Sequence, residues 1–130
     1  MSDRKGYVMV VEDDLDLRMT LVIALQDAGF KAVGVDNGLD ALRQIIDHKR
    51  LGRPCLILLD INIPVMSGWE LLIVMSMMKE ELTKIPIVLV TGENVPDIIT
   101  NTVPDKKIDV VRKPASINVI IEKVRQHCES

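Results

Sequence analysis

Short apolar segments recur along the chain, and each is followed by a stretch in which apolar residues return every three or four positions. Apolar runs of four to eight residues are typical of buried strands, whereas the longer period is typical of one face of a helix. The sequence therefore predicts five strands alternating with helical segments. The predicted strands are Tyr7–Val11, Lys31–Val35, Cys55–Leu59, Ile87–Val90 and Ile108–Val111.

Five helical segments are expected between and after these strands. The third covers about 68–82, and the fourth, in 93–107, has the weakest pattern because Pro96 and Pro104 bracket it. Strands that alternate with helices, without hairpin signals, predict βαβ units and a parallel sheet. We expect an α/β fold with one doubly wound five-stranded sheet and five flanking helices. The predicted core faces of the first, second and last helices are Leu17, Leu21, Ala24, Leu25 and Ala28; Leu39, Leu42, Ile45 and Ile46; and Ile117, Ile120, Ile121 and Val124.

Length and composition narrow the class of protein. A chain of 130 residues predicts a single domain, 1–130. The net charge of −3 and a total of only three aromatic residues argue against a nucleic-acid partner, because such surfaces need clustered positive charge or stacking rings. No apolar run reaches the roughly 18 residues that a membrane span requires. We therefore expect a cytoplasmic protein with no nucleic-acid or membrane partner.

The two cysteines, Cys55 and Cys128, are separated by 73 positions and fit no metal-ligand spacing. Each is surrounded by apolar residues, and free cysteine behaves as a small buried hydrophobe in reducing compartments. The sequence therefore predicts two buried free thiols.

Polar side chains follow four of the five predicted strands at the point where each strand ends. Ligands of open α/β sheets bind beyond these carboxyl ends, and clustered carboxylates there suit Mg²⁺. The acids of the first and third strands meet only if those strands are neighbours, as in the flavodoxin-like order 2-1-3-4-5. For Asp14 and Asp16 we favour a solvated helix N-terminus over a site. The residues expected at the shared edge are Glu12, Asp13, Asp60, Thr91 and Lys113.

In this order the motifs resemble the receiver domain of two-component response regulators. The resemblance covers about residues 6–127 and rests on four segments: Val10-Val11-Glu12-Asp13-Asp14, Leu58-Leu59-Asp60-Ile61-Asn62-Ile63-Pro64 with Gly68, Val90-Thr91-Gly92, and Arg112-Lys113-Pro114. It implies that Asp60 accepts a phosphoryl group from a phosphohistidine. It also implies a bound Mg²⁺, held by Glu12, Asp13, Asp60 and the main-chain carbonyl of Asn62. Thr91 and Lys113 would contact the phosphoryl oxygens, and Asn62 and Glu93 would tune the lifetime of the acyl phosphate.

The same resemblance implies the partners and the kind of activity. The phosphoryl donor would be a sensor histidine kinase or a histidine phosphotransfer protein, and a target protein or output domain would receive the signal. The domain would be a self-catalysing switch and not an enzyme, either standing alone or taken from a larger protein. The third helix, with Leu71–Met75, Met77 and Met78, is apolar nearly all round, so we expect exposed Met-rich surface that serves partner contact or a homodimer.

One departure bears on how the switch is relayed. The family usually has an aromatic residue three positions before the lysine, where this chain has Val110.

Two other classes of protein would need a different sequence directly after the first strand. A haloacid-dehalogenase-like phosphatase would want an Asp-x-Asp pattern there, and a flavodoxin-like cofactor carrier would want a Ser/Thr/Gly-rich phosphate loop. The remaining alternative is a degenerate receiver that acts as a phosphorylation-independent protein-interaction module. That reading needs a missing acceptor, acid or lysine, and none is missing.

Overall fold

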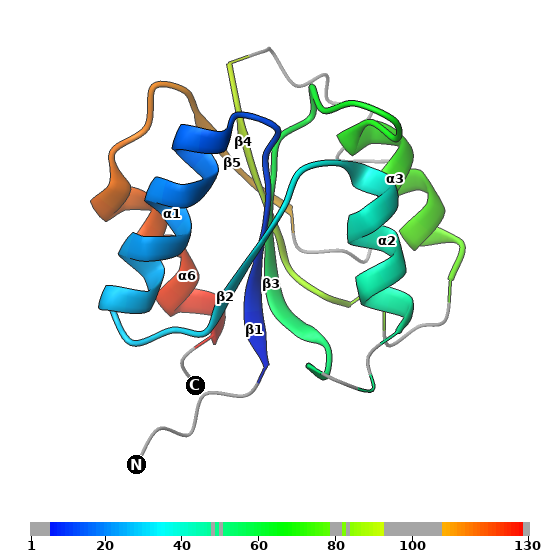
Figure 1. Ribbon diagram of the computed structural model, residues 1–130, viewed down its shortest axis with the longest axis horizontal. Helices are drawn as coiled ribbons and strands as arrows, with labels where there is room; N and C mark the ends of the chain where they lie inside the picture. The colour runs from blue at the N-terminus through cyan, green and yellow to red at the C-terminus, as the bar shows by residue number, and fades with distance from the viewer. Residues whose placement is uncertain are drawn as a thin grey trace.

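The fold is an open α/β sheet with helices on both faces. The computed structural model describes residues 6–47, 49, 51–78, 82, 84–92 and 108–128. All strand pairs are parallel, in the order β2-β1-β3-β4-β5, which confirms the predicted sheet (Figure 1). The elements are β1 (Tyr7–Val11), α1 (Leu15–Asp27), β2 (Ala32–Val35), α2 (Gly38–Ile46), β3 (Pro54–Leu59), α3 (Gly68–Ser76), β4 (Ile87–Thr91), β5 (Ile108–Arg112) and α6 (Ile117–Cys128).

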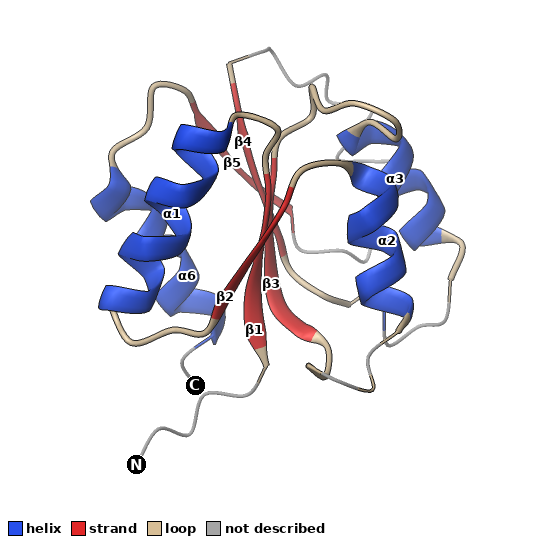
Figure 2. Cartoon of the chain, viewed as in Figure 1, coloured by secondary structure: helices blue, strands red, loops and turns tan. Residues whose placement is uncertain are grey.

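The core lies in two apolar clusters, one on each face of the sheet. Side chains alternate across a strand, so Tyr7, Met9 and Val11 of β1 join the cluster under α2 and α3. Val8 and Val10 point the other way, into the cluster under α1 and α6. Figure 2 shows the two helix pairs on opposite sides of the sheet. Cover on both faces explains why the central strands β1 and β3 are apolar throughout.

The N-terminus of each of three helices is capped by the side chain of the residue that precedes the helix. Asp14 accepts a hydrogen bond from the backbone N–H of Leu17 at 3.1 Å and caps α1, as expected for a solvated helix N-terminus. Asn37 accepts one from the N–H of Asp40 at 2.9 Å and caps α2. Ser67 and Glu70 form a capping box at α3. These caps fix where each loop at the carboxyl edge of the sheet turns into a helix.

The helices differ from the expectations in two places. Helix α3 ends at Ser76, earlier than the predicted Leu82, and Met77 is its C-cap. Ile46, expected on the core face of α2, is 52% exposed, because Ala41 and Ile45 already fill the space against the sheet. The predicted helical segment 93–107 lies outside the described residues. None of the described helices is long and apolar enough to cross a membrane.

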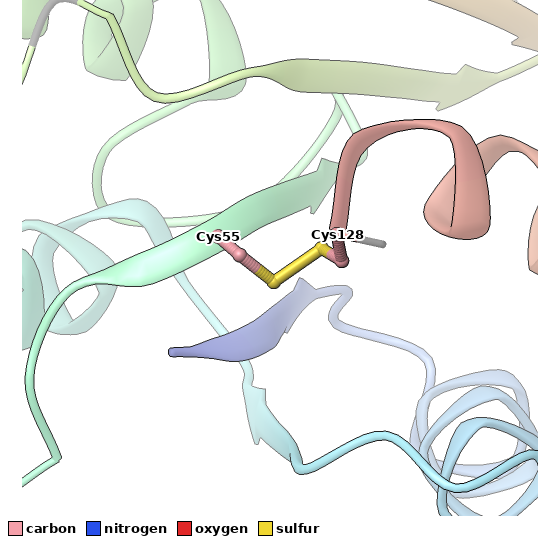
Figure 3. The surroundings of a disulfide bond; sticks show 2 residues. All are labelled: Cys55 and Cys128. Carbon is pink, nitrogen blue, oxygen red and sulfur yellow. A yellow bond between two sulfur atoms is a disulfide. The ribbon is translucent and has the colours of Figure 1, made fainter. Parts of the chain in front are cut away.

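The prediction of two free thiols is wrong. Cys55, in β3, and Cys128, the last residue of α6, form a disulfide with their Cα atoms 5.6 Å apart (Figure 3). Helix α6 packs on β3, so the start of the strand and the end of the helix meet. Sequence separation carries no information on that proximity, which depends on where the last helix crosses the sheet.

Candidate functional site

The carboxyl ends of β1, β3, β4 and β5 meet at one edge of the sheet, uppermost in Figure 1, and form an open pocket. Hydrogen bonds between main-chain groups align these ends: the N–H of Asp60 donates to the carbonyl of Val11, and the N–H of Lys113 to that of Thr91. The structure thus brings together the site residues predicted from the sequence, except Glu93, which lies outside the described residues. The pocket is lined by Glu12, Asp13, Asp14, Asp60, Asn62, Thr91, Gly92 and Lys113.

Lys113 connects the two buried carboxylates of the pocket. Its Nζ donates to Glu12 Oε1 at 2.7 Å and to Asp60 Oδ2 at 2.8 Å. The side chains of Glu12 and Asp60 are only 5% and 9% exposed, while that of Lys113 is 28% exposed. One ammonium group, at the end of β5, therefore neutralises part of the negative charge at the ends of β1 and β3. The peptide bond between Lys113 and Pro114 is cis.

The surroundings of this cluster raise the pKa of both Glu12 and Lys113. Burial raises the pKa of Glu12, and the nearby Asp60 carboxylate raises it further, although the hydrogen bond from Lys113 opposes both effects. Burial alone would lower the pKa of Lys113, but its hydrogen bonds to Asp60 and Glu12 outweigh burial and raise that pKa. Lys113 is consequently a fixed positive charge across the physiological range. The site retains an excess of negative charge that a second cation would relieve.

Three carboxylates are placed to hold such a cation. Oxygens of Glu12, Asp13 and Asp60 all lie within 4.8 Å of one another. Asp13 is exposed, so the group is open to solvent on one side. Carboxylate oxygens with open positions for water are the ligands that Mg²⁺ prefers. The residues present therefore fit a magnesium ion, with Asp60 as a shared ligand.

The loop that follows Asp60 is held by main-chain contacts. The N–H of Asn62 donates to Asp60 Oδ1 at 3.1 Å, which fixes one carboxylate oxygen while Lys113 holds the other. The N–H of Gly68 donates to the carbonyl of Ile61 at 2.9 Å. A Cβ at Gly68 would lie 2.7 Å from the carbonyl oxygen of Asp60, so only glycine fits there. The side chain of Asn62, two residues after Asp60, is exposed.

One contributor to the site was missed in the sequence. Arg18 Nη1 donates to the main-chain carbonyl of Glu12 at 2.8 Å and so braces the loop between β1 and α1. The signal was its position one turn into a helix that begins directly after the acidic residues. Thr91, in contrast, was expected and lies fully buried at the end of β4.

Comparison with known proteins decides the family. The model of the response regulator receiver domain matches residues 8–125. The chain belongs to this family. It is a receiver domain of two-component signalling, as the motifs predicted.

Individual relatives agree with this assignment. The chain is 28% identical over 123 residues to the CAI-1 autoinducer sensor kinase/phosphatase CqsS of Vibrio cholerae, covering 95% of this chain and 17% of that protein's length. It matches the signal receiver domain of a histidine kinase from Syntrophus aciditrophicus with a TM-score of 0.78 and 27% identity, over 95% of this chain and 90% of that one. The receiver domain of sensor histidine kinase PA1611 from Pseudomonas aeruginosa, solved with magnesium in its active-site cleft, has the same fold at 20% identity, with a TM-score of 0.76 and coverage of 96% and 98%.

Proposed function

We propose that this receiver accepts a phosphoryl group on Asp60 from the phosphohistidine of a sensor histidine kinase or a histidine phosphotransfer protein, and that Mg²⁺ is required. The observation that carries the proposal is the environment of Asp60. Its carboxylate lies at the end of a buried strand, contacts Lys113 at 2.8 Å and shares an oxygen cluster with Glu12 and Asp13. A structural aspartate needs a cap or a partner, but it does not need two further carboxylates beside it.

The reaction follows from this arrangement. An oxygen of Asp60 attacks phosphorus, an O–P bond forms, the P–N bond to the donor imidazole breaks, and the imidazole leaves with its bonding electron pair. Glu12, Asp13, Asp60 and the carbonyl of Asn62 would hold Mg²⁺, which when bound neutralises charge on the transferring oxygens. The magnesium in the cleft of the PA1611 receiver supports this assignment. Lys113 then donates its hydrogen bond to a phosphoryl oxygen instead of to the Asp60 carboxylate. Its second contact, with Glu12, continues to balance its positive charge.

The same groups would allow the protein to hydrolyse its own acyl phosphate and return to the unphosphorylated state. An acyl phosphate is open to attack by water, and the exposed side chain of Asn62 lies where it can hinder or orient that water. Together with Glu93 it would set the lifetime of the phosphorylated state. We therefore propose a signalling protein that catalyses its own phosphorylation and dephosphorylation and passes its state to a target protein or output domain.

Thr91 would transmit the change in phosphorylation state from the site to the rest of the domain. Its hydroxyl is expected to move toward a phosphoryl oxygen, because the new anion offers acceptors that the free carboxylate lacks. Val110, paired with Leu89 in the sheet, has no ring to follow that movement. Coupling then runs through the backbone that begins at Gly92.

A docking surface for the donor lies beside the site. Leu15, Met19 and Ile23, one helical turn apart on α1, are each at least 50% exposed. Helix α1 starts three residues after Glu12, so this apolar stripe extends directly away from the pocket. A helical protein that presents a phosphohistidine could cover the stripe and reach Asp60 at the same time. We propose it as the contact with the kinase or phosphotransfer protein.

The phosphorylation step is tested with a small donor. The protein is incubated with acetyl phosphate and Mg²⁺, and its intact mass is measured. We expect a phosphoryl adduct that disappears when a chelator replaces Mg²⁺ and in Asp60→Asn, because an amide oxygen is a poor nucleophile. If no adduct forms in the wild type, or if Asp60→Asn is labelled equally, the proposal is wrong and the degenerate-receiver reading gains support.

The docking surface is tested with two matched variants. Ile23 on α1 and Ile73 on α3 are 50% and 48% exposed, on opposite faces of the sheet. Ile23→Glu should slow phosphotransfer from a phosphorylated histidine phosphotransfer protein, and both variants should react normally with acetyl phosphate. If only Ile73→Glu slows transfer, the donor docks on the apolar face of α3 instead.

A further inference from the structure

The disulfide between Cys55 and Cys128 lies at the opposite end of the sheet from the acceptor site. Cys55 is the second residue of β3, and Asp60 follows the last residue of that strand. Five residue steps of extended chain place them about 16 Å apart. The bond joins this strand to the final residue of α6, the helix that follows the Lys113 segment (Figure 3). Helix α6 is therefore attached near the site at one end and by a covalent bond at the other.

We propose that this bond is a reversible redox latch, which decides whether the last turn of α6 stays on β3 while the acceptor site remains unchanged. The fold does not depend on the bond. Ile120 and Val124 of α6 are buried in the same apolar cluster as Leu56 and Leu58 of β3. These contacts keep α6 on the sheet after reduction and leave the two thiols near each other, so the bond can form again.

The exposure of the two cysteines indicates which sulfur a reductant attacks first. Cys128 is 8% exposed and belongs to the core cluster, whereas Cys55 is only partly buried. Thiol–disulfide exchange begins with attack on an accessible sulfur. A thiolate reductant would attack Cys55 first and release the sulfur of Cys128.

The chemistry balances with a dithiol as the reductant. A protein dithiol of the thioredoxin class transfers two electrons and two protons: its first thiolate forms a mixed disulfide with Cys55, and its second thiolate resolves that bond. The products are two thiols in this chain and one disulfide in the reductant. Oxidised glutathione reverses the reaction by two exchange steps and leaves as two molecules of the reduced tripeptide.

Loss of the bond acts mainly on the end of α6. While the disulfide is intact, the last turn of α6 cannot separate from β3 unless the strand unfolds. In the reduced protein, the turn between Val124 and Cys128 keeps its helical hydrogen bonds and the packing of these two residues, while the three residues between them are exposed or partly exposed. Helix ends held in this way open locally at low free-energy cost. The redox state therefore changes how accessible the end of α6 is to a partner.

The latch is tested by hydrogen exchange and thiol counting on the full chain. The samples are the oxidised wild type, the wild type reduced by dithiothreitol without denaturant, and Cys55→Ser/Cys128→Ser as a control that cannot form the bond. We expect no reactive thiols before reduction and two after it, with the bond restored by oxidised glutathione. Amides of 124–128 should exchange about tenfold faster or more in the reduced protein and in the double variant, while those of β1 change little. Adduct formation with acetyl phosphate should stay within about twofold.

Three outcomes would overturn the latch. Reactive thiols in the protein as isolated under oxidising conditions would show that the bond does not form. A need for denaturant before dithiothreitol can act would make the bond a fixed structural element. Equal exchange at the end of α6 in all three samples would show that the bond restrains nothing there.

Discussion

Replacing Lys113 by methionine should destabilise the protein by removing the partner of two buried carboxylates. Removing one partner of a buried ion pair costs about 3–5 kcal/mol, because the remaining charge is left without compensation. Lys113 is 28% exposed, so water screens part of the interaction and we expect about 2–3 kcal/mol. Methionine keeps most of the apolar stem, which limits the loss of packing.

The chain offers a matched control in Lys123→Met. Lys123 Nζ contacts Asp109 Oδ2 at 2.7 Å, the same distance as the contact between Lys113 and Glu12, and its side chain is 30% exposed. The difference lies in the carboxylate, since that of Asp109 is 36% exposed. A pair of this kind contributes about 0–1 kcal/mol. Urea unfolding, followed by the fluorescence of Trp69, should therefore show a shift in midpoint of about 1–2 M for Lys113→Met and a much smaller one for Lys123→Met.

The destabilisation caused by Lys113→Met should depend on pH. The pKa of Lys113 is raised in the folded state, so loss of its own proton lowers stability only above its unfolded value of 10.5. The raised pKa of Glu12 means that ionising this residue costs stability as the pH rises through that pKa. Without Lys113 that cost grows, so the gap between wild type and Lys113→Met should be smallest in acid and widen toward neutral pH. Equal losses in the two lysine variants, or a gap independent of pH, would refute the reasoning.

Three further predictions concern the same pocket. Asp13→Asn should abolish Mg²⁺ binding, followed by Trp69 fluorescence, and raise the melting temperature of the metal-free protein slightly, because it relieves repulsion among clustered carboxylates; unchanged Mg²⁺ affinity would contradict the metal assignment. Gly68→Ala should lower the free energy of unfolding in urea by about 1–3 kcal/mol and slow adduct formation, since its Cβ would press on the backbone of Asp60. The control Gly92→Ala, whose Cβ would meet nothing nearer than 4.0 Å, should lower that free energy far less. Beryllofluoride with Mg²⁺ should shift the amide signals of Asp60, Thr91 and Gly92 strongly and those of Val110 weakly, and large shifts centred on Val110 would show that the usual surface responds without the usual ring.

Most of the fold could be predicted because its pattern is local. Each strand is a short apolar run, and the sheet confirms the flavodoxin-like strand order, which places the acids of β1 beside Asp60. The end of α3 could not be predicted, since the apolar run continues to Met78 while the helix stops at Ser76. There the C-cap geometry of Met77 decides the boundary, and apolar spacing does not report it.

The candidate site was predictable for a related reason. The carboxyl ends of parallel strands meet at one edge, so the position of a residue along its strand was enough to bring Glu12, Asp60 and Lys113 together. The double contact of Lys113 and the brace from Arg18 depend on side-chain reach, which no spacing encodes. The disulfide depends on the crossing of α6 over β3, a tertiary feature that two isolated cysteines cannot reveal.

Locating the phosphoryl group is the most direct test of the central claim, that Asp60 is the acceptor in a Mg²⁺-dependent reaction. After reaction with acetyl phosphate, borohydride reduction converts an aspartyl phosphate into homoserine, which survives digestion and can be assigned by fragment masses. We predict homoserine at position 60 alone, formed with Mg²⁺ and absent when a chelator replaces it. Homoserine at position 13 or 14, or equal yields with and without Mg²⁺, would contradict the account.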